Sequence, residues 1–281
     1  MDSKPSQRND RRNVATENGL RKIFIQKSDG KKLVGILHET GSKEVVIICH
    51  GFRSSKDCAP VVNLAAALES QSISAFRFDF PGYGESEEPF QLDISLRNPD
   101  VLHDVVQHFV KNKRIVTAIV GHSQGGCDAL RYASKYNHVR TVVNISGWIN
   151  LAKVVEAMFG KAVFEEIRQK GFVDVKNKKG EVWIHATQEQ WMEMQRVDIR
   201  SEVLLISEDC RVLTVHGSKD EVVSPADSFE YAKLIRNHKL HIIEGADHEY
   251  TSHQGELASA VLNFIKQGSW RQEGASILSR I

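Results

Sequence analysis

Residues Ile115–Gly126 read IVTAIVGHSQGG and join a strand-like run directly to a glycine-rich turn. The run Ile115–Val120 is apolar and mostly β-branched, as is typical of a buried strand in a parallel sheet. Gly121-His122-Ser123-Gln124-Gly125 matches the pattern G-x-S-x-G, and Gln124–Tyr136 continues as a helix-like segment. A turn this sharp needs small residues where its two arms pass closely. We therefore expect the Ser123 hydroxyl to project from the strand end as a nucleophile.

Strand-like and helix-like segments alternate along the rest of the chain, which indicates βαβ units. The fold class predicted is α/β, with a mostly parallel sheet, helices on both faces and an antiparallel hairpin turning at Asp29-Gly30. Asn98 and Ser224 are expected to cap helices, with Asp227 completing a capping box. The other predicted elements are strands Arg21–Gln26, Leu33–His38, Glu44–Cys49, Ile73–Phe80, Val139–Ile145, Arg211–His216 and Leu240–Ile243, and helices Pro60–Glu69 and Leu257–Ile265.

A nucleophilic serine needs a base, and the base needs an acid that orients it. Two loops after later predicted strands supply these residue types in the order Ser…Asp…His that this topology expects. Asp220 is the preferred acid and His248 the preferred base. The rivals left open are Glu221, Asp227 and Asp247 for the acid, and His241 and His253 for the base.

The anionic intermediate of acyl transfer needs two backbone N–H donors. Gln124 supplies one, because it follows the serine directly. The second is expected from the loop after the first parallel strand, where Gly51 permits a tight bend and Phe52 is the candidate donor. We also place the Phe52 side chain near the substrate. His50 is expected to hold this loop by hydrogen bonds.

The stretch 147–209 breaks the alternation and is rich in Trp, Phe and Met. We interpret it as a cap inserted into a single α/β domain that covers residues 20–268, with the acyl pocket beneath it. Residues 1–19 are predicted to be a disordered tail, and residues 269–281 a C-terminal tail. An organelle-targeting role for the N-terminal tail is left open.

The composition argues against several classes of protein. Lys+Arg is 37 and Asp+Glu is 36, so the formal net charge of +1 does not favour a nucleic-acid partner. No apolar run approaches the roughly 20 residues of a membrane span, and no secretory signal is evident, so a cytoplasmic location is expected. His248 and His253 are five residues apart and would diverge on a helix, so we expect no zinc there. No metal and no cofactor are expected.

Taken together, these segments resemble the α/β-hydrolase superfamily, and within it the esterase and serine-aminopeptidase-like group that includes cinnamoyl and feruloyl esterases. The segments that carry the resemblance are Cys49–Phe52, Phe76–Ser86, Gly121–Gly126, Val215–Asp220 and Gly245–His248. The resemblance implies Ser123 as nucleophile, Asp220 and His248 as its partners, and the Phe52 and Gln124 amides as an oxyanion hole. One departure is visible: Pro225 stands one position later than in many relatives.

The function predicted is a serine esterase that cleaves a small-molecule carboxylic ester through an acyl-enzyme on Ser123. A thioesterase, amidase or acyltransferase would use the same residues. From another class, a small-molecule receptor built on a hydrolase scaffold would use the same pocket. The natural ester and the oligomeric state are not fixed by these patterns.

Overall fold

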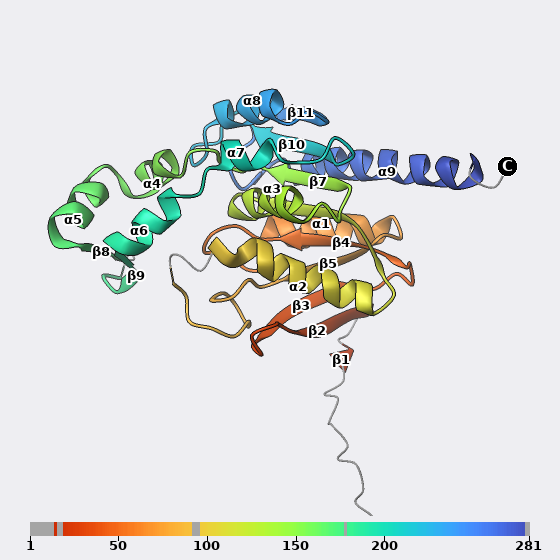
Figure 1. Ribbon diagram of the computed structural model, residues 1–281, viewed down its shortest axis with the longest axis horizontal. Coiled ribbons are helices and arrows are strands. Elements are labelled where there is room, and N and C mark those ends of the chain that lie inside the picture. The colour runs from red at the N-terminus through yellow and green to blue at the C-terminus, as the bar shows by residue number, and fades with distance from the viewer. Residues whose placement is uncertain (1–13, 16–18, 92–95, 177–178, 279–281) are drawn as a thin grey trace, which may run out of the picture.

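A nine-stranded sheet forms the centre of the protein (Figure 1). The computed structural model describes residues 14–15, 19–91, 96–176 and 179–278. Among these, the strand order is β1-β2-β3-β5-β4-β6-β7-β10-β11. Neighbours from β5 to β11 are parallel, whereas β1, β2 and β3 pair in antiparallel fashion at one edge. The predicted mostly parallel sheet with an antiparallel hairpin is thus confirmed.

The central strands are apolar along their whole length because helices cover both faces of the sheet. All five residues of β5 and of β7 are buried, and only the first residue of β4 is not. The strands are β1 (Val14–Ala15), β2 (Leu20–Gln26), β3 (Lys32–His38), β4 (Glu44–Cys49), β5 (Ser74–Phe78), β6 (Ile115–His122), β7 (Thr141–Ile145), β10 (Arg211–Gly217) and β11 (His238–Ile243).

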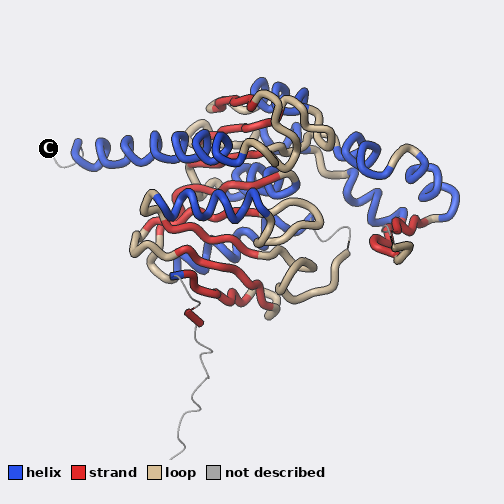
Figure 2. The backbone as a smooth tube through the Cα atoms, turned by 180° about the vertical axis from the view of Figure 1, so that it is seen from behind, coloured by secondary structure: helices blue, strands red, loops and turns tan. Residues whose placement is uncertain are grey.

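Two apolar cores flank the sheet, one on each face. On one face, α1 and α9 pack against the strands through residues such as Leu64 and Leu257. On the other face, α2, α3, α7 and α8 pack through Val105, Leu130 and Tyr231. Figure 2 shows α9 crossing the first of these faces. The helices are α1 (Ala59–Ser70), α2 (Asn98–Lys111), α3 (Gln124–Tyr136), α7 (Ile199–Val203), α8 (Pro225–Leu234) and α9 (Gln254–Leu278).

A separate group of elements projects from the carboxyl side of the sheet between β7 and α7 (Figure 1). We call residues 151–195 the cap segment; it has a small apolar cluster of its own around Ile167 and Trp191. Ile199 and Val203 of α7 pack in the core beside α3, so the part that leaves the sheet ends sooner than residue 209. The elements of the cap segment are α4 (Leu151–Phe159), α5 (Ala162–Lys170), an antiparallel pair β8 (Phe172–Lys176) and β9 (Val182–Thr187), and α6 (Gln188–Gln195).

The described parts of the two chain ends contain regular secondary structure. Val14–Ala15 pairs with β2 as a short strand, while residues 1–13 and 16–18 of the predicted N-terminal tail lie outside the described residues. Helix α9 continues to Leu278, so most of the predicted C-terminal tail is helical and extends beyond the sheet (Figure 1). Among the described helices, none has both the length and the apolar composition that crossing a bilayer requires.

Of the predicted helix-capping residues, Ser224 is confirmed, whereas Asn98 and Asp227 have other roles. Asn98 is the first residue of α2, not its N-cap, and its amide donates to Asp128 instead. Ser224 caps α8 as predicted, but the Asp227 carboxylate accepts a hydrogen bond from the Ile149 N–H rather than completing a capping box. Both side chains are drawn into contacts that are distant in sequence, because burial makes an unsatisfied polar group costly.

Candidate active site

The turn between β6 and α3 places Ser123 at the carboxyl edge of the sheet. Ser123 has φ of 56° and ψ of −120°, a strained conformation for a residue with a side chain. The glycines on either side make the turn possible. A Cβ on Gly121 would lie 2.0 Å from the Gly125 carbonyl oxygen, and one on Gly125 would lie 2.5 Å from the His50 carbonyl oxygen. The predicted requirement for small residues is therefore met by direct backbone contacts.

The structure brings Ser123, His248 and Asp220 into one chain of hydrogen bonds. Ser123 Oγ lies 3.0 Å from His248 Nε2, and His248 Nδ1 lies 2.8 Å from Asp220 Oδ2. Because a carboxylate only accepts, His248 must carry its proton on Nδ1 and present a lone pair at Nε2. In this tautomer His248 can take a proton from the Ser123 hydroxyl.

Asp220 is held as a carboxylate by four neighbouring nitrogen atoms. Oδ1 accepts from the N–H groups of Val222 and Val223, at 3.0 and 2.8 Å. Oδ2 faces His248 and also His216, whose Nε2 is 3.2 Å away. Burial alone would raise the pKa of Asp220, but the hydrogen bonds from His216 and His248 lower it well below its usual range. Asp220 therefore stays ionised beside its histidine.

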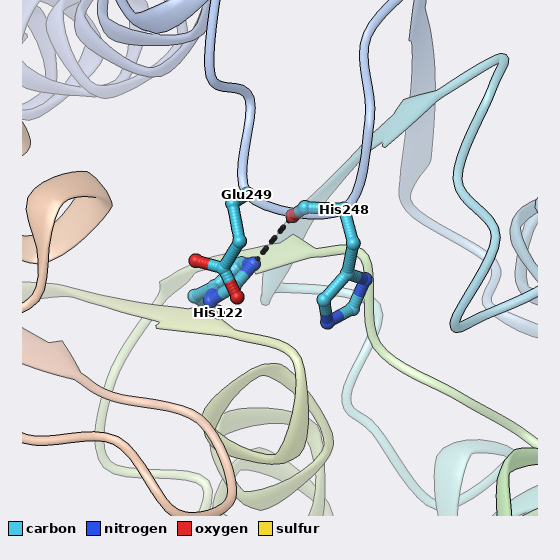
Figure 3. A group of neighbouring side chains, drawn as sticks. All are labelled: His122, His248 and Glu249. Atoms are coloured by element: carbon cyan, nitrogen blue, oxygen red, sulfur yellow. Dashed lines mark hydrogen bonds between the residues drawn. The ribbon is translucent and has the colours of Figure 1, made fainter. Parts of the chain in front are cut away.

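The loop that carries His248 is tied to the turn that carries Ser123. His122 Nε2 donates to the His248 carbonyl oxygen at 2.8 Å, which fixes the loop at His248 itself (Figure 3). Burial, with a smaller contribution from nearby His248, lowers the pKa of His122 to about 4. His122 is thus a neutral donor near neutral pH and adds no positive charge beside His248.

The loop after β4 passes directly over Ser123. A Cβ on Gly51 would lie 3.1 Å from the Ser123 Cβ, so residues larger than glycine would crowd the hydroxyl. His50 holds this loop as predicted: its Nε2 accepts from the Phe80 N–H at 3.0 Å and its Nδ1 donates to the Gly51 carbonyl at 2.7 Å. The Phe52 ring packs edge-on against Phe90 and lines the cavity described below.

Buried polar groups fix this loop from behind. Asp79 accepts from the Lys56 backbone N–H at 2.7 Å, from Lys56 Nζ at 2.8 Å and from the Glu85 N–H at 3.0 Å. Lys56 also pairs with Asp57 and Glu85, and its side chain is 3% exposed. The network joins the loops after β4 and β5, so it holds the Gly51–Phe52 segment in place.

A second buried carboxylate lies behind the turn. Asp128 accepts from the amides of Gln124 and Asn98, at 3.0 and 2.7 Å, with Arg131 3.8 Å away. Burial raises the pKa of Asp128 to about 6, against the lowering effect of Arg131 and the two amides. The Gln124 side chain is therefore turned back into the protein, which leaves its backbone N–H as the group beside Ser123.

Ser123 and His248 open into a cavity of about 200 Å³ between the sheet and the cap segment. Its lining is largely apolar, and Glu249 is the one carboxylate in it among the described residues. The side chains from the cap segment that line it are Leu151, Val154, Val155, Met158, Phe159, Val163, Ile167, Val173, Val175, Ile184, Ala186, Trp191 and Met194.

The rival residues lie elsewhere. Asp247 accepts from the Thr251 N–H, Asp227 from the Ile149 N–H, and Glu221 is exposed. His241 lies within β11 and His253 precedes α9. Sequence reasoning missed His216 and Asp128 as supports of the site and Glu249 as part of its wall. For His216 and Glu249 the one signal was proximity in the chain, because His216 lies four residues before Asp220 and Glu249 follows His248 directly.

Comparison with known proteins identifies the family of this chain. A model of the family described as serine aminopeptidase, S33, matches residues 40–254. The protein belongs to this family of α/β hydrolases. The residues matched by this S33 model include the strand-to-helix turn at Ser123 and the loops that carry Asp220 and His248.

Several other proteins resemble this S33 member. The esterase Est1E from Butyrivibrio proteoclasticus, solved with ferulic acid, is 24% identical, with a TM-score of 0.71 over 88% of this chain and 98% of that one. The Pyrococcus furiosus esterase Pf2001 is 19% identical, with a TM-score of 0.69 over 88% and 90%. The Saccharomyces cerevisiae protein YDL057W is 23% identical over 88% of this chain and 76% of its own length. The two solved structures show the shared fold.

Proposed function

We propose that this protein is a carboxylic ester hydrolase that works through an acyl-enzyme on Ser123. The observation that carries the proposal is the hydrogen-bonded chain Ser123–His248–Asp220, with distances of 3.0 and 2.8 Å, at the wall of an apolar cavity. Such a chain activates an alcohol for attack on a carbonyl.

In the first half of the reaction, Ser123 Oγ bonds to the carbonyl carbon while its proton moves to His248 Nε2. The oxyanion that forms is stabilised by the backbone N–H groups of Phe52 and Gln124. Collapse of the intermediate breaks the bond to the leaving oxygen, which takes the proton from His248. Asp220 stabilises the imidazolium in between. Water then repeats the sequence on the acyl-enzyme and releases the acid and free Ser123.

The cavity favours an uncharged, apolar acyl group. Cavities of about 150 Å³ lined by aliphatic and aromatic side chains bind a benzene ring, so about 200 Å³ suits a phenyl group with a short linker or an aliphatic chain of similar size. The aromatic acid seen with Est1E is of this kind. The described side chains of the cap segment that line the cavity include no carboxylate, so a free amino group held among them would be desolvated without a partner, which argues against aminoacyl substrates.

The test compares wild type with Ser123→Ala on p-nitrophenyl butyrate and on an aminoacyl p-nitroanilide. We expect the ester to be the better substrate and Ser123→Ala to lose activity by about 10⁴-fold or more. Ser134→Ala, a half-buried serine on the far part of α3, is the matched control and should keep full activity. Equal activity of wild type and Ser123→Ala would refute the proposal.

A fluorophosphonate probe separates hydrolase from receptor. We expect wild type to be labelled on Ser123 within minutes and the Ser123→Ala protein not to be labelled. Absence of labelling, together with a ligand-dependent rise in Tm, would instead support a binding protein on the same scaffold. Greater activity on the p-nitroanilide would favour a peptidase.

A further inference from the structure

Glu249 is an acidic side chain in the wall of the cavity that the reaction above does not use. It follows His248 directly, and Figure 3 shows both side chains hanging from the same loop, with the Glu249 carboxylate over the His122 ring. One carboxylate oxygen, one nitrogen of His248 and one of His122 all lie within 4.8 Å of one another. Glu249 thus lies beside the group that receives and returns the proton.

No described Lys or Arg neutralises this carboxylate. Glu249 makes no ion pair with a cationic side chain in the described part of the chain, and its electrostatic neighbours are His248, Asp247 and Asp220. His122 beside it is buried and donates its Nε2 proton to the His248 carbonyl. The net local charge is therefore negative at one end of a cavity whose other walls are largely apolar.

The position of Glu249 places it near the leaving alcohol of the substrate rather than near the acyl group. The leaving oxygen must come within hydrogen-bond distance of His248 Nε2 to be protonated. A group two carbons beyond that oxygen can then reach a carboxylate within 4.8 Å of the imidazole. The acyl group, by contrast, is enclosed by the apolar side chains of the cap segment.

Resting on the ester hydrolase proposed above, we infer that Glu249 selects esters whose leaving alcohol carries a cationic nitrogen about two carbons from the ester oxygen. An ammonium there gains the attraction of Glu249 while the apolar acyl group fills the cavity. The gain is that of one partly exposed ion pair, which corresponds to about a fivefold preference and is reduced by salt.

The experiment uses two esters of the same shape, butyrylcholine and 3,3-dimethylbutyl butyrate, which differ in a quaternary nitrogen against a quaternary carbon. The measured quantity is the ratio of kcat/KM for the charged ester to that for the neutral one. We expect a ratio of about five in wild type, about one in Glu249→Gln and below one in Glu249→Lys. Glu244→Gln, an exposed acid of the same loop that does not line the cavity, should keep the wild-type ratio.

Equal ratios in wild type and Glu249→Gln would overturn the inference even if both esters are hydrolysed. A second pair of esters, alanine p-nitrophenyl ester and propionate p-nitrophenyl ester, differs by an amine on the acyl side. If Glu249→Gln changed the kcat/KM ratio of this pair and not that of the two butyrates, the inference would also be overturned. Calorimetric titration of the Ser123→Ala protein with the two butyrates tests the same preference in Kd without turnover. Failure of the ester hydrolase proposal is thereby distinguished from failure of the role of Glu249.

Discussion

The cap segment differs from the rest of the fold, the nine-stranded sheet with its flanking helices, which we call the body. The two regions differ in how their charged groups are buried and paired. In the body, charged groups such as Asp79, Asp128 and Asp220 are buried and satisfied by several hydrogen bonds each. In the cap segment, ion pairs such as Lys170–Glu166 lie at the surface, and helix α4 has no fully buried residue. Buried networks of hydrogen bonds hold polar atoms in one arrangement. The apolar side chains of the cap segment instead determine the shape of the cavity. The body therefore fixes the chemistry, and the cap segment determines what fits.

The largest effect expected is on turnover, from the Asp220→Asn substitution in the body. An amide at this position presents a donor to His248 and reverses the tautomer that leaves a lone pair facing Ser123. We expect kcat/KM on p-nitrophenyl butyrate to fall by about 10⁴ with Tm close to wild type. Asp247→Asn is the control, since its carboxylate accepts a hydrogen bond from the Thr251 N–H in the local turn, and it should lose little. A larger loss in the control would reassign the acid.

Lys56→Met should give the largest loss of stability. The substitution leaves Asp79, which is fully buried, without its charged partner. Breaking one side of a buried ion pair costs about 3–5 kcal/mol in the free energy of unfolding. Urea denaturation at neutral pH measures it. A loss below 1 kcal/mol would contradict the view that buried charge pairs hold the body together.

Asp128 makes the stability of the body depend on pH. Its pKa is raised to about 6 in the folded protein, so the carboxyl favours folding when protonated. Its contribution is fully present below pH 3.8 and is lost as the pH rises through about 6, a change on the order of 3 kcal/mol. The free energy of unfolding of wild type minus that of Asp128→Asn should therefore fall as the pH rises over that range. A difference that is flat with pH would contradict the raised pKa of the buried Asp128 carboxyl.

In the cap segment, Val155→Trp should alter the preference for acyl chain length without changing the hydrogen-bonded chain at Ser123. Val155 is half-buried on α4 and lines the cavity, so a larger ring takes up room there. We expect kcat/KM for p-nitrophenyl octanoate to fall about tenfold relative to that for the acetate. Lys153→Trp, on the exposed side of the same helix, should leave the ratio unchanged. An equal fall for both esters would mean that the cavity does not receive the acyl group.

The smallest effect is expected at the surface of the cap segment. Lys170 lies 2.8 Å from Glu166 on α5, with side chains 58% and 39% exposed. Lys170→Met should change the free energy of unfolding by less than about 0.5 kcal/mol. Thermal unfolding beside Lys56→Met compares the two regions directly. Similar losses at both lysines would remove the distinction between body and cap segment.

Much of the body is readable from local sequence. The apolar β-branched runs fix the strands because both faces of the sheet are covered, and the motif around Ser123 fixes the turn because only glycine fits at Gly121 and Gly125. The order of the loops then places Asp220 and His248 at the same edge, since the carboxyl ends of parallel strands meet there. These inferences need only short-range pattern and topology.

What the tertiary structure decided are the contacts between polar groups far apart in the chain. The local sequence predicts that Asn98 and Asp227 cap helices. In the structure Asn98 donates to Asp128, and Asp227 accepts from the Ile149 N–H. Packing brings these partners close, and a buried polar group without a partner is costly. Likewise, no periodicity reveals that Glu249 forms part of the cavity wall or which residues of the cap segment face it. Such arrangements depend on how helices and strands pack against one another, and the pattern of a single segment does not predict that packing.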